Sequence, residues 1–188
     1  VQADVRDPES SAALVDTVVE RFGHLDVLVN NAGVTKVISH DDLDAVTDDV
    51  FRDIFEVNVL GTWRLTRLAM PHLKATGDGA VVMVTSIAGV RPTGSSIPYA
   101  TSKAALNHMT ALLARVTGPE VRVNAVAPGL VRTPWTADWG FMHDAMKDAA
   151  PLGRSAEPED IASLVVDLAA SRYVTGQVVV ADGGLTLN

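Results

Sequence analysis

Three residues with hydrogen-bonding or acid–base side chains stand close together in the segment 85–103, TSIAGVRPTGSSIPYATSK. Ser86 carries a hydroxyl, Tyr99 a phenol and Lys103 an ammonium group, and Lys103 follows Tyr99 by four positions. Side chains at this spacing project from the same face of a helix. A nearby ammonium group favours the phenolate and lowers the phenol pKa, which is ~10 in a free tyrosine.

A tyrosine with a lowered pKa can exchange a proton with a carbonyl or alcohol oxygen while a hydride moves to or from the adjacent carbon. The Ser86 hydroxyl can hydrogen-bond the same oxygen. Each residue taken alone is more simply explained by structure: Tyr99 and Lys103 as an exposed helical pair, and Ser86 as a loop residue. Their combination predicts one catalytic site.

The flanking elements are expected to position these side chains. Residues 81–84 are apolar and rich in β-branched side chains, which predicts a buried strand that ends just before Ser86. A loop with Gly and Pro follows, and residues 101–116 have the apolar spacing of a helix. Ser86 is therefore expected at the carboxyl end of a strand, and Tyr99 and Lys103 on the next helix.

The Tyr-x-x-x-Lys motif of Tyr99 and Lys103, with Ser86 thirteen residues before the tyrosine, resembles the short-chain dehydrogenase/reductase family. A 3-oxoacyl-acyl-carrier-protein reductase is a typical member. The four-residue spacing of Tyr99 and Lys103 argues against the enoyl-reductase branch of the family, in which the tyrosine and the lysine lie further apart. The resemblance covers residues 1–188 as one domain, and it implies an α/β fold with a Rossmann-type doubly wound parallel sheet, NAD or NADP as cofactor, and a homotetramer or dimer.

The resemblance also implies four catalytic roles. Tyr99 is the acid/base, Lys103 lowers its pKa and binds the nicotinamide ribose, and Ser86 orients the substrate oxygen. The phrase VNVLGT resembles the helix that carries the fourth residue, here Asn58, at a kink that frees a backbone carbonyl to hold a water in a proton relay. Without the resemblance, Asn58 in the middle of the helix predicted from Thr47 to near Gly77 would be a packing residue.

Cofactor contacts are implied at three places. Residues 30–33, NNAG, follow a predicted strand at 25–29; alone they would be a turn, but the resemblance places them beneath the adenosine ribose and nicotinamide. The turn after the predicted strand 121–126 is expected to bind the nicotinamide carboxamide and to lie near the pyrophosphate, and residues 4–5 to meet the adenine. The implied contact residues are Asp4, Val5, Asn30, Ala32, Gly33, Tyr99, Lys103, Pro128, Gly129, Val131 and Thr133.

An aromatic and methionine cluster follows the cofactor turn, in a segment that the resemblance makes a mobile substrate lid. Such clusters are more often part of a hydrophobic core. The hypothesis is an apolar substrate pocket next to Ser86, lined by Ile97, Trp135, Trp139 and Phe141.

The remaining pattern predicts a parallel sheet with helices on both faces and right-handed crossovers. Residues 1–5 are expected to be the tail of a strand, and a helix is expected to open at residues 7–9, to run through Phe22 and to stop at Gly23. Another helix begins at Pro158, and a final strand spans 178–181. The pattern starts in the third strand of the family. It lacks the glycine-rich turn that would hold the pyrophosphate and the second strand that would separate NAD from NADP.

The family's first strand pairs beside the strand predicted at 25–29, so this apolar strand would lie unpaired at an edge. We therefore expect that the parent protein carries a further βαβα unit, and that this chain is shortened, cleaved or completed by another polypeptide. Apolar positions that could pair helices across a two-fold axis are Leu65, Leu68, Met109 and Leu112, although core packing explains them equally well.

Composition limits the other classes of function. The 188 residues, 47% of them hydrophobic, suffice for one core, and the formal charge of −8 argues against a nucleic-acid partner. The sequence has no cysteine, which excludes disulfides and thiolate catalysis and suits the cytoplasm. The five histidines lack metal-site spacing, and the apolar runs are far shorter than the ~20 residues that cross a bilayer, so we expect no metal and no membrane.

Two functions remain open. The first is an NAD(P)-dependent oxidoreductase that interconverts a small-molecule secondary alcohol and a ketone. The second is a catalytically silent fragment or scaffold of the same fold that does not bind dinucleotide. A serine hydrolase is a distant third, because Ser86 lies in TSIAG and not in a G-x-S-x-G elbow.

Overall fold

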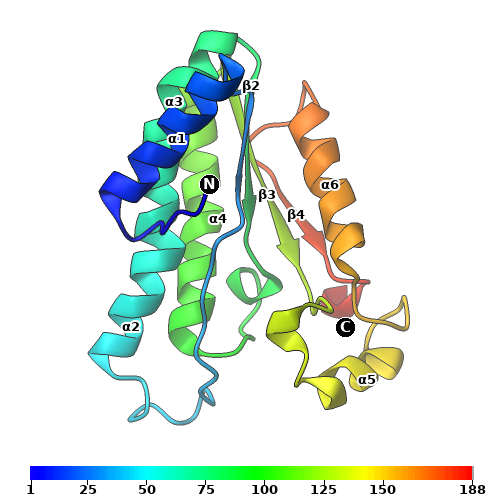
Figure 1. Ribbon diagram of the computed structural model, residues 1–188. Coiled ribbons are helices and arrows are strands. Elements are labelled where there is room, and N and C mark those ends of the chain that lie inside the picture. Colours follow the sequence, from blue (N-terminus) through cyan, green and yellow to red (C-terminus); the bar gives the residue numbers. More distant parts are fainter. Residues whose placement is uncertain (188) are drawn as a thin grey trace.

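Four parallel strands form the central sheet of the computed structural model, which describes residues 1–187 (Figure 1). Their sheet order is β1-β2-β3-β4. The strands are β1 (Val27–Asn30), β2 (Gly79–Val84), β3 (Val121–Pro128) and β4 (Val178–Ala181). Each strand overlaps a segment that the sequence predicts to be a strand. The expected doubly wound parallel sheet is therefore confirmed.

Helices cover both faces of this sheet, because β2 and β3 send alternate side chains to opposite sides. One face carries α1 (Pro8–Phe22), α3 (Thr62–Thr76) and α4 (Ile97–Thr117), and the other carries α6 (Pro158–Ala170) (Figure 1). Val81, Met83, Val123 and Ala125 belong to the first core cluster, whereas Val82 and Val126 pack with Ile161 and Leu168 in the second.

The helix predicted from Thr47 to near Gly77 forms, with a local change of winding. Thr47 caps α2 (Asp48–Phe55) by accepting a hydrogen bond from the Val50 N–H at 3.4 Å. A π-helical turn, η1 (Glu56–Gly61), then leads directly into α3. Such turns widen a helix locally and are frequent at functional sites. The buried Asn58 lies within this π-turn.

Residues 1–5 do not form the predicted strand tail. Residues 1–4 have no regular secondary structure and lead into a turn in which the Asp7 N–H donates to the Asp4 carbonyl at 3.1 Å. A strand needs a neighbour for its backbone groups, and in the described part of the chain β1 pairs only with β2. Val27 and Val29, which alternate with the buried Leu28 and Asn30, are 41% and 42% exposed, so one face of β1 is open.

The segment between β3 and α6 contains two short helical elements. These are η3 (Pro134–Thr136) and α5 (Gly140–Ala149), and a further short turn, η2 (Ile87–Gly89), follows β2. Over residues 1–187, no helix is long and apolar enough to cross a membrane, and no three His, Cys, Asp or Glu side chains gather as metal ligands.

Candidate active site

The three side chains singled out by their spacing form one cluster at the carboxyl end of β2. Ser86 follows this strand and opens η2, where its Oγ accepts a hydrogen bond from the Ala88 N–H at 3.1 Å. The Ser86 side chain also hydrogen-bonds the side chain of Tyr99. The Lys103 Nζ lies 5.7 Å from the centroid of the Tyr99 ring.

The start of α4 sets the position of the phenol. Ser96, fully buried, caps the helix by accepting from the Tyr99 N–H at 3.4 Å, and Pro98 occupies the first turn. Lys103 follows one turn later on the same face. At Gly89 a Cβ would come within 2.6 Å of the Lys103 carbonyl carbon, so only glycine lets the loop after Ser86 lie against α4.

Lys103 is fixed by the backbone of β2. The side chain is 4% exposed, and its Nζ donates to the Val84 carbonyl at 2.9 Å. Burial disfavours the charged form and lowers the pKa of Lys103 from 10.5 to about 8. At neutral pH the side chain therefore remains predominantly an ammonium ion, held in one place.

The pKa of Tyr99 is raised in the structure, whereas the sequence predicts a lowered pKa. Burial raises the pKa of the phenol above its ordinary value, and the hydrogen bond with Ser86 lowers it only in part. The sequence predicts that Lys103 lowers this pKa, but its ammonium group lies over the ring and donates to Val84. Desolvation therefore dominates, and the phenol is protonated at neutral pH.

Asn58 connects the loop after β1 to α4. Its fully buried amide accepts from the Val34 N–H at 2.8 Å and donates to the Val34 carbonyl at 3.0 Å and to the Ser102 Oγ at 2.9 Å. Ser102 in turn donates to the Tyr99 carbonyl at 2.7 Å. Nothing in the sequence marks Ser102, whose role depends on this long-range contact.

The predicted cofactor residues of β1 and β3 lie at the same carboxyl edge as Ser86. Asn30 is buried and donates to the Thr66 Oγ1 at 2.9 Å, so its amide holds α3 to the sheet. Ala32 and Gly33 follow it, and a Cβ at Gly33 would lie 3.4 Å from the Asn58 Oδ1 and 3.5 Å from the Lys103 Nζ.

The turn after β3 is held by its backbone. Pro128 ends the strand, and the Gly129 N–H donates to the Ala181 carbonyl at 3.0 Å. A Cβ at Gly129 would meet the Asp182 Cβ at 2.9 Å, so the approach of the two segments requires glycine. Val131 pairs with Ala156 in an isolated bridge, and Thr133 caps η3.

Asp4 and Val5 lie beside η1 and α3. The Asp4 carboxylate is exposed and pairs with Arg6 at 2.7 Å, and the hydrogen bonds from Arg6 lower the pKa of Asp4 to about 2. A Cβ at Gly61 would lie 2.7 Å from the Val5 Cγ2, which shows how closely the N-terminal segment packs on the π-turn.

The proposed substrate residues are brought to the site only in part. The ring of Trp135 meets that of Tyr99 edge-on, with centroids 6.3 Å apart and an interplanar angle of 85°. Ile97 and Trp139 are partly buried at the starts of α4 and α5. Phe141 is 87% exposed. The buried residue of α5 is His143, two positions further, and residues two apart do not share a helix face.

A family model described as Enoyl-(Acyl carrier protein) reductase matches residues 1–186 of this chain. A solved short-chain type dehydrogenase/reductase from Mycobacterium ulcerans superposes with a TM-score of 0.90 at 31% identity, covering 99% of this chain and 69% of that chain. The chain belongs to the short-chain dehydrogenase/reductase family.

Two further relatives in the short-chain dehydrogenase/reductase family match over the whole chain. The protein named "Granaticin polyketide synthase putative ketoacyl reductase 2", from Streptomyces violaceoruber, is 52% identical, with 100% of this chain and 76% of the relative covered. A solved structure described as "ElxO with NADP Bound" has a TM-score of 0.91 at 30% identity and covers 100% of this chain and 78% of that chain.

Proposed function

We propose that this protein is an NAD(P)-dependent oxidoreductase that interconverts a secondary alcohol and a ketone, with Tyr99 as acid/base. One observation carries the proposal: the Tyr99 phenol is hydrogen-bonded to Ser86 and lies beside the buried Lys103 ammonium group at the carboxyl edge of a parallel sheet. Open α/β sheets bind their ligands at this edge. Family membership supports the reaction class.

The residues at this edge fit the nicotinamide half of a dinucleotide. Gly33 leaves space beside Lys103 and Asn58 that a side chain would fill. The backbone of Gly129 and Val131 and the Thr133 side chain would hold the carboxamide and the adjoining phosphate. When bound, the nicotinamide exchanges a hydride with the substrate carbon. The NADP bound in the ElxO structure agrees with this cofactor class.

The raised pKa of Tyr99 suits the reduction direction. A protonated phenol can donate to the carbonyl oxygen of a ketone at neutral pH, whereas alcohol oxidation needs the phenolate. The Ser86 hydroxyl, already on Tyr99, would orient that oxygen. The ketoacyl reductase name of the Streptomyces violaceoruber relative agrees with a ketone substrate, as does the four-residue spacing of Tyr99 and Lys103.

Lys103 and Asn58 would support proton transfer. The Lys103 ammonium supplies a fixed positive charge, which favours the phenolate left after the proton has moved. The π-turn at Asn58 would present a backbone carbonyl to a relay water, while the side-chain amide remains engaged with Val34 and Ser102. In this proposal the backbone carbonyl of Asn58 takes part in the proton relay, and its side chain has a structural role.

The substrate would be apolar on the side facing the lid. Trp135 supplies an aromatic edge next to the reacting phenol, with Ile97 and Trp139 as further walls. Phe141 would contribute only if α5 turned inward on binding, since it now faces solvent.

A homo-oligomer would form through the outer faces of α3 and α4. Of the four apolar positions considered, Leu65 lies in the first core cluster and Leu68 and Met109 pack against it, so packing accounts for these three. Leu112 is 54% exposed, and Trp63 and Val116 on the same helices are 44% and 69% exposed. These exposed residues would meet a second copy.

Cofactor titration tests the proposal. Quenching of tryptophan fluorescence by NADH or NADPH, followed by turnover on a panel of apolar ketones, is expected for the enzyme. Turnover should be lost in Tyr99→Phe with binding retained. The alternative is a catalytically silent scaffold of the same fold that does not bind dinucleotide. Absence of quenching at millimolar cofactor would favour that alternative.

A further inference from the structure

Helix α5 is attached to the molecule mainly by one polar side chain. His143, 5% exposed, is the buried residue of this helix, while Phe141 and Met142 are 87% and 46% exposed. Among the described residues, neither core cluster includes a residue of α5. The buried side chain of this helix is therefore held by hydrogen bonds.

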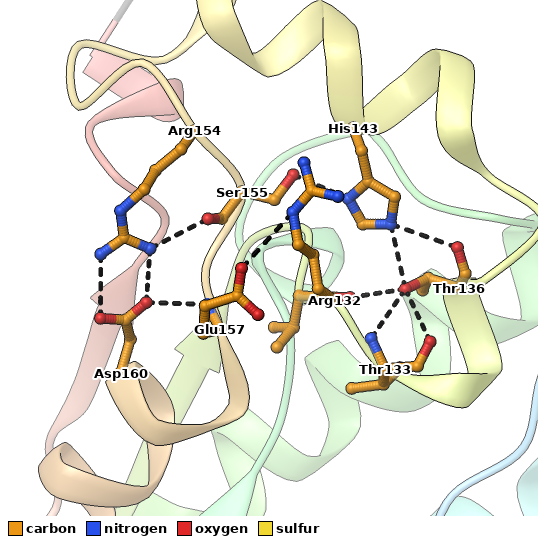
Figure 2. A network of polar contacts seen from close by, with 9 residues as sticks. Arg132, Thr133, Thr136, His143, Arg154, Ser155, Glu157 and Asp160 are labelled. Atoms are coloured by element: carbon orange, nitrogen blue, oxygen red, sulfur yellow. Dashed lines mark hydrogen bonds and ion pairs between the residues drawn. The ribbon is translucent and has the colours of Figure 1, made fainter.

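Both ring nitrogens of His143 have partners, on two different segments (Figure 2). Nδ1 lies 2.8 Å from the Oγ of Ser155, a residue 2% exposed just before α6. Nε2 lies 3.2 Å from the carbonyl oxygen of Thr136 and 3.2 Å from its Oγ1. The ring thus joins the turn Pro134–Thr136 to the segment that leads into α6.

The partners decide which nitrogen carries the hydrogen. A carbonyl oxygen only accepts. The Thr136 hydroxyl donates its own hydrogen to the Val131 carbonyl at 2.6 Å, so toward the ring it too can only accept. Nε2 is therefore the donor, and the Nδ1 of a neutral ring accepts from the Ser155 hydroxyl. Every hydrogen in this network then has an acceptor.

The charged groups around the network pair with one another. Arg132 lies 3.5 Å from Glu157, and Arg154 lies 2.6 Å from Asp160 (Figure 2). Arg154 also donates to the Ser155 carbonyl at 3.0 Å. Ser155 is therefore held at its backbone by Arg154 while its hydroxyl meets His143, which makes it a firm anchor for the ring.

The turn that His143 holds belongs to the site. The Thr133 N–H donates to the Thr136 Oγ1 at 3.2 Å, and the Thr136 N–H returns a bond to the Thr133 carbonyl at 3.0 Å. Trp135, between them in the chain, carries the ring that meets Tyr99. Displacing Thr136 would therefore displace both Thr133 and Trp135.

We propose that His143 is a positioning residue: by tying Thr136 to Ser155 it fixes the turn that places Trp135 against Tyr99. Its effect on catalysis rests on the proposed function. The loss of this tie weakens substrate binding more than the chemical step, because Ser86 and Lys103 are held by hydrogen bonds with Ala88 and Val84, and Tyr99 meets the turn through the ring of Trp135.

Amide hydrogen exchange in the ligand-free protein tests the tie without any activity. The reporters are the N–H groups of Thr136 and Trp139, which bond to the Thr133 and Thr136 carbonyls. His143→Asn places its amide where Nδ1 lies and loses the bonds to Thr136, whereas His143→Gln reaches the Nε2 position and keeps a donor there. Both reporters should exchange about tenfold faster in His143→Asn, the factor expected for one lost hydrogen bond, and less so in His143→Gln.

Control variants distinguish the local loss of the His143 hydrogen bonds from a general loss of stability. His108→Asn, on an exposed face of α4, should leave both reporters unchanged, and the β3 amides should stay protected in every variant. If His143→Asn fails to fold, Ser155→Ala removes only the donor to Nδ1 and should speed the same two amides. Unchanged exchange at Thr136 and Trp139 in the folded variants overturns the proposal.

Steady-state kinetics then test the catalytic consequence. In His143→Asn, KM for an apolar ketone should rise about tenfold with kcat within about twofold, the pattern of lost ground-state binding. A fall in kcat with KM unchanged would contradict the positioning role. Tyr99→Phe should lower kcat by roughly 10²–10⁴-fold and leave exchange at Thr136 and Trp139 as in the parent, so failure of the proposed function and failure of this inference are distinguishable.

Discussion

The Lys103 ammonium nitrogen donates to the Val84 carbonyl at 2.9 Å and lies over the ring of Tyr99, 5.7 Å from its centroid. The lysine is thus held by the strand that precedes Ser86. The ammonium group can therefore stabilise a phenolate at Tyr99 although it makes no direct hydrogen bond to the neutral phenol. In the resting protein burial raises the pKa of Tyr99. During proton transfer the charge of Lys103 favours the phenolate that forms.

Tyr99→Phe removes the proposed proton donor while keeping the ring that contacts Trp135. We expect kcat to fall by roughly 10²–10⁴-fold, the usual contribution of a general acid or base. Cofactor affinity, measured by fluorescence quenching, should change little. Tyr173→Phe is the matched control, since Tyr173 is fully exposed. A Tyr99→Phe variant with parent turnover would refute the assignment.

Lys103 predicts a dependence of stability on alkaline pH. Its pKa is about 8 in the folded protein and 10.5 in the unfolded chain. Below pH 8 both states bind the proton, so the cost of the buried charge is present in full. Between about pH 8 and 10.5 the folded protein releases its proton first, and stability rises with pH.

The gain in the free energy of unfolding between pH 8 and 10.5 amounts to on the order of 3 kcal/mol, from about 1.4 kcal/mol per pKa unit. Urea unfolding of the parent and of Lys103→Met across this pH range measures the gain, because the variant has no lysine to titrate at this position. Lys147→Met, at an exposed position, should follow the parent. If the parent and Lys103→Met show the same pH dependence, the lysine is not buried as a charge.

Gly129→Ala tests the close approach after β3. The added Cβ would lie 2.9 Å from the Asp182 Cβ, so the turn or the C-terminal segment must shift. We expect a loss of about 1–3 kcal/mol in the free energy of unfolding, as for other overpacked sites. Gly140→Ala, which meets nothing within 4 Å, serves as the control. A neutral Gly129→Ala would show that the two segments separate easily.

Trp135→Ala should weaken binding of apolar ketones, because the side chain lies at the reacting phenol. We expect KM to rise about tenfold, within the 1–3 kcal/mol typical of a lost hydrophobic contact in a pocket. Phe141→Ala should leave KM unchanged, since Phe141 faces solvent. An equal rise in both variants would show that α5 closes over the substrate and brings Phe141 into the pocket.

The sequence is sufficient to predict the sheet and the central cluster. The run at 81–84 is apolar throughout, which predicts burial on both sides, the run at 121–126 is rich in valine, and the spacing of Tyr99 and Lys103 places them on one helix face. The bounds of α1 follow from Pro8 and Gly23, which act as start and stop signals.

Features that depend on long-range packing could not be predicted. The acidity of Tyr99 follows from burial that no local pattern records. The sequence pattern indicates only a surface or packing residue at His143, because its partners Thr136 and Ser155 are seven and twelve positions away. The exposure of Phe141 likewise depends on which face α5 turns inward.

The amide of Asn58 bonds to both the N–H and the carbonyl of Val34. This copies the two-way pairing that one residue offers another in an antiparallel ladder. The loop beyond β1 is therefore held by a side chain that pairs with it as the backbone of a neighbouring strand would. Aspartate, although nearly the same size, would set its carboxylate against the Val34 carbonyl, so even the conversion of one nitrogen to oxygen would release the loop.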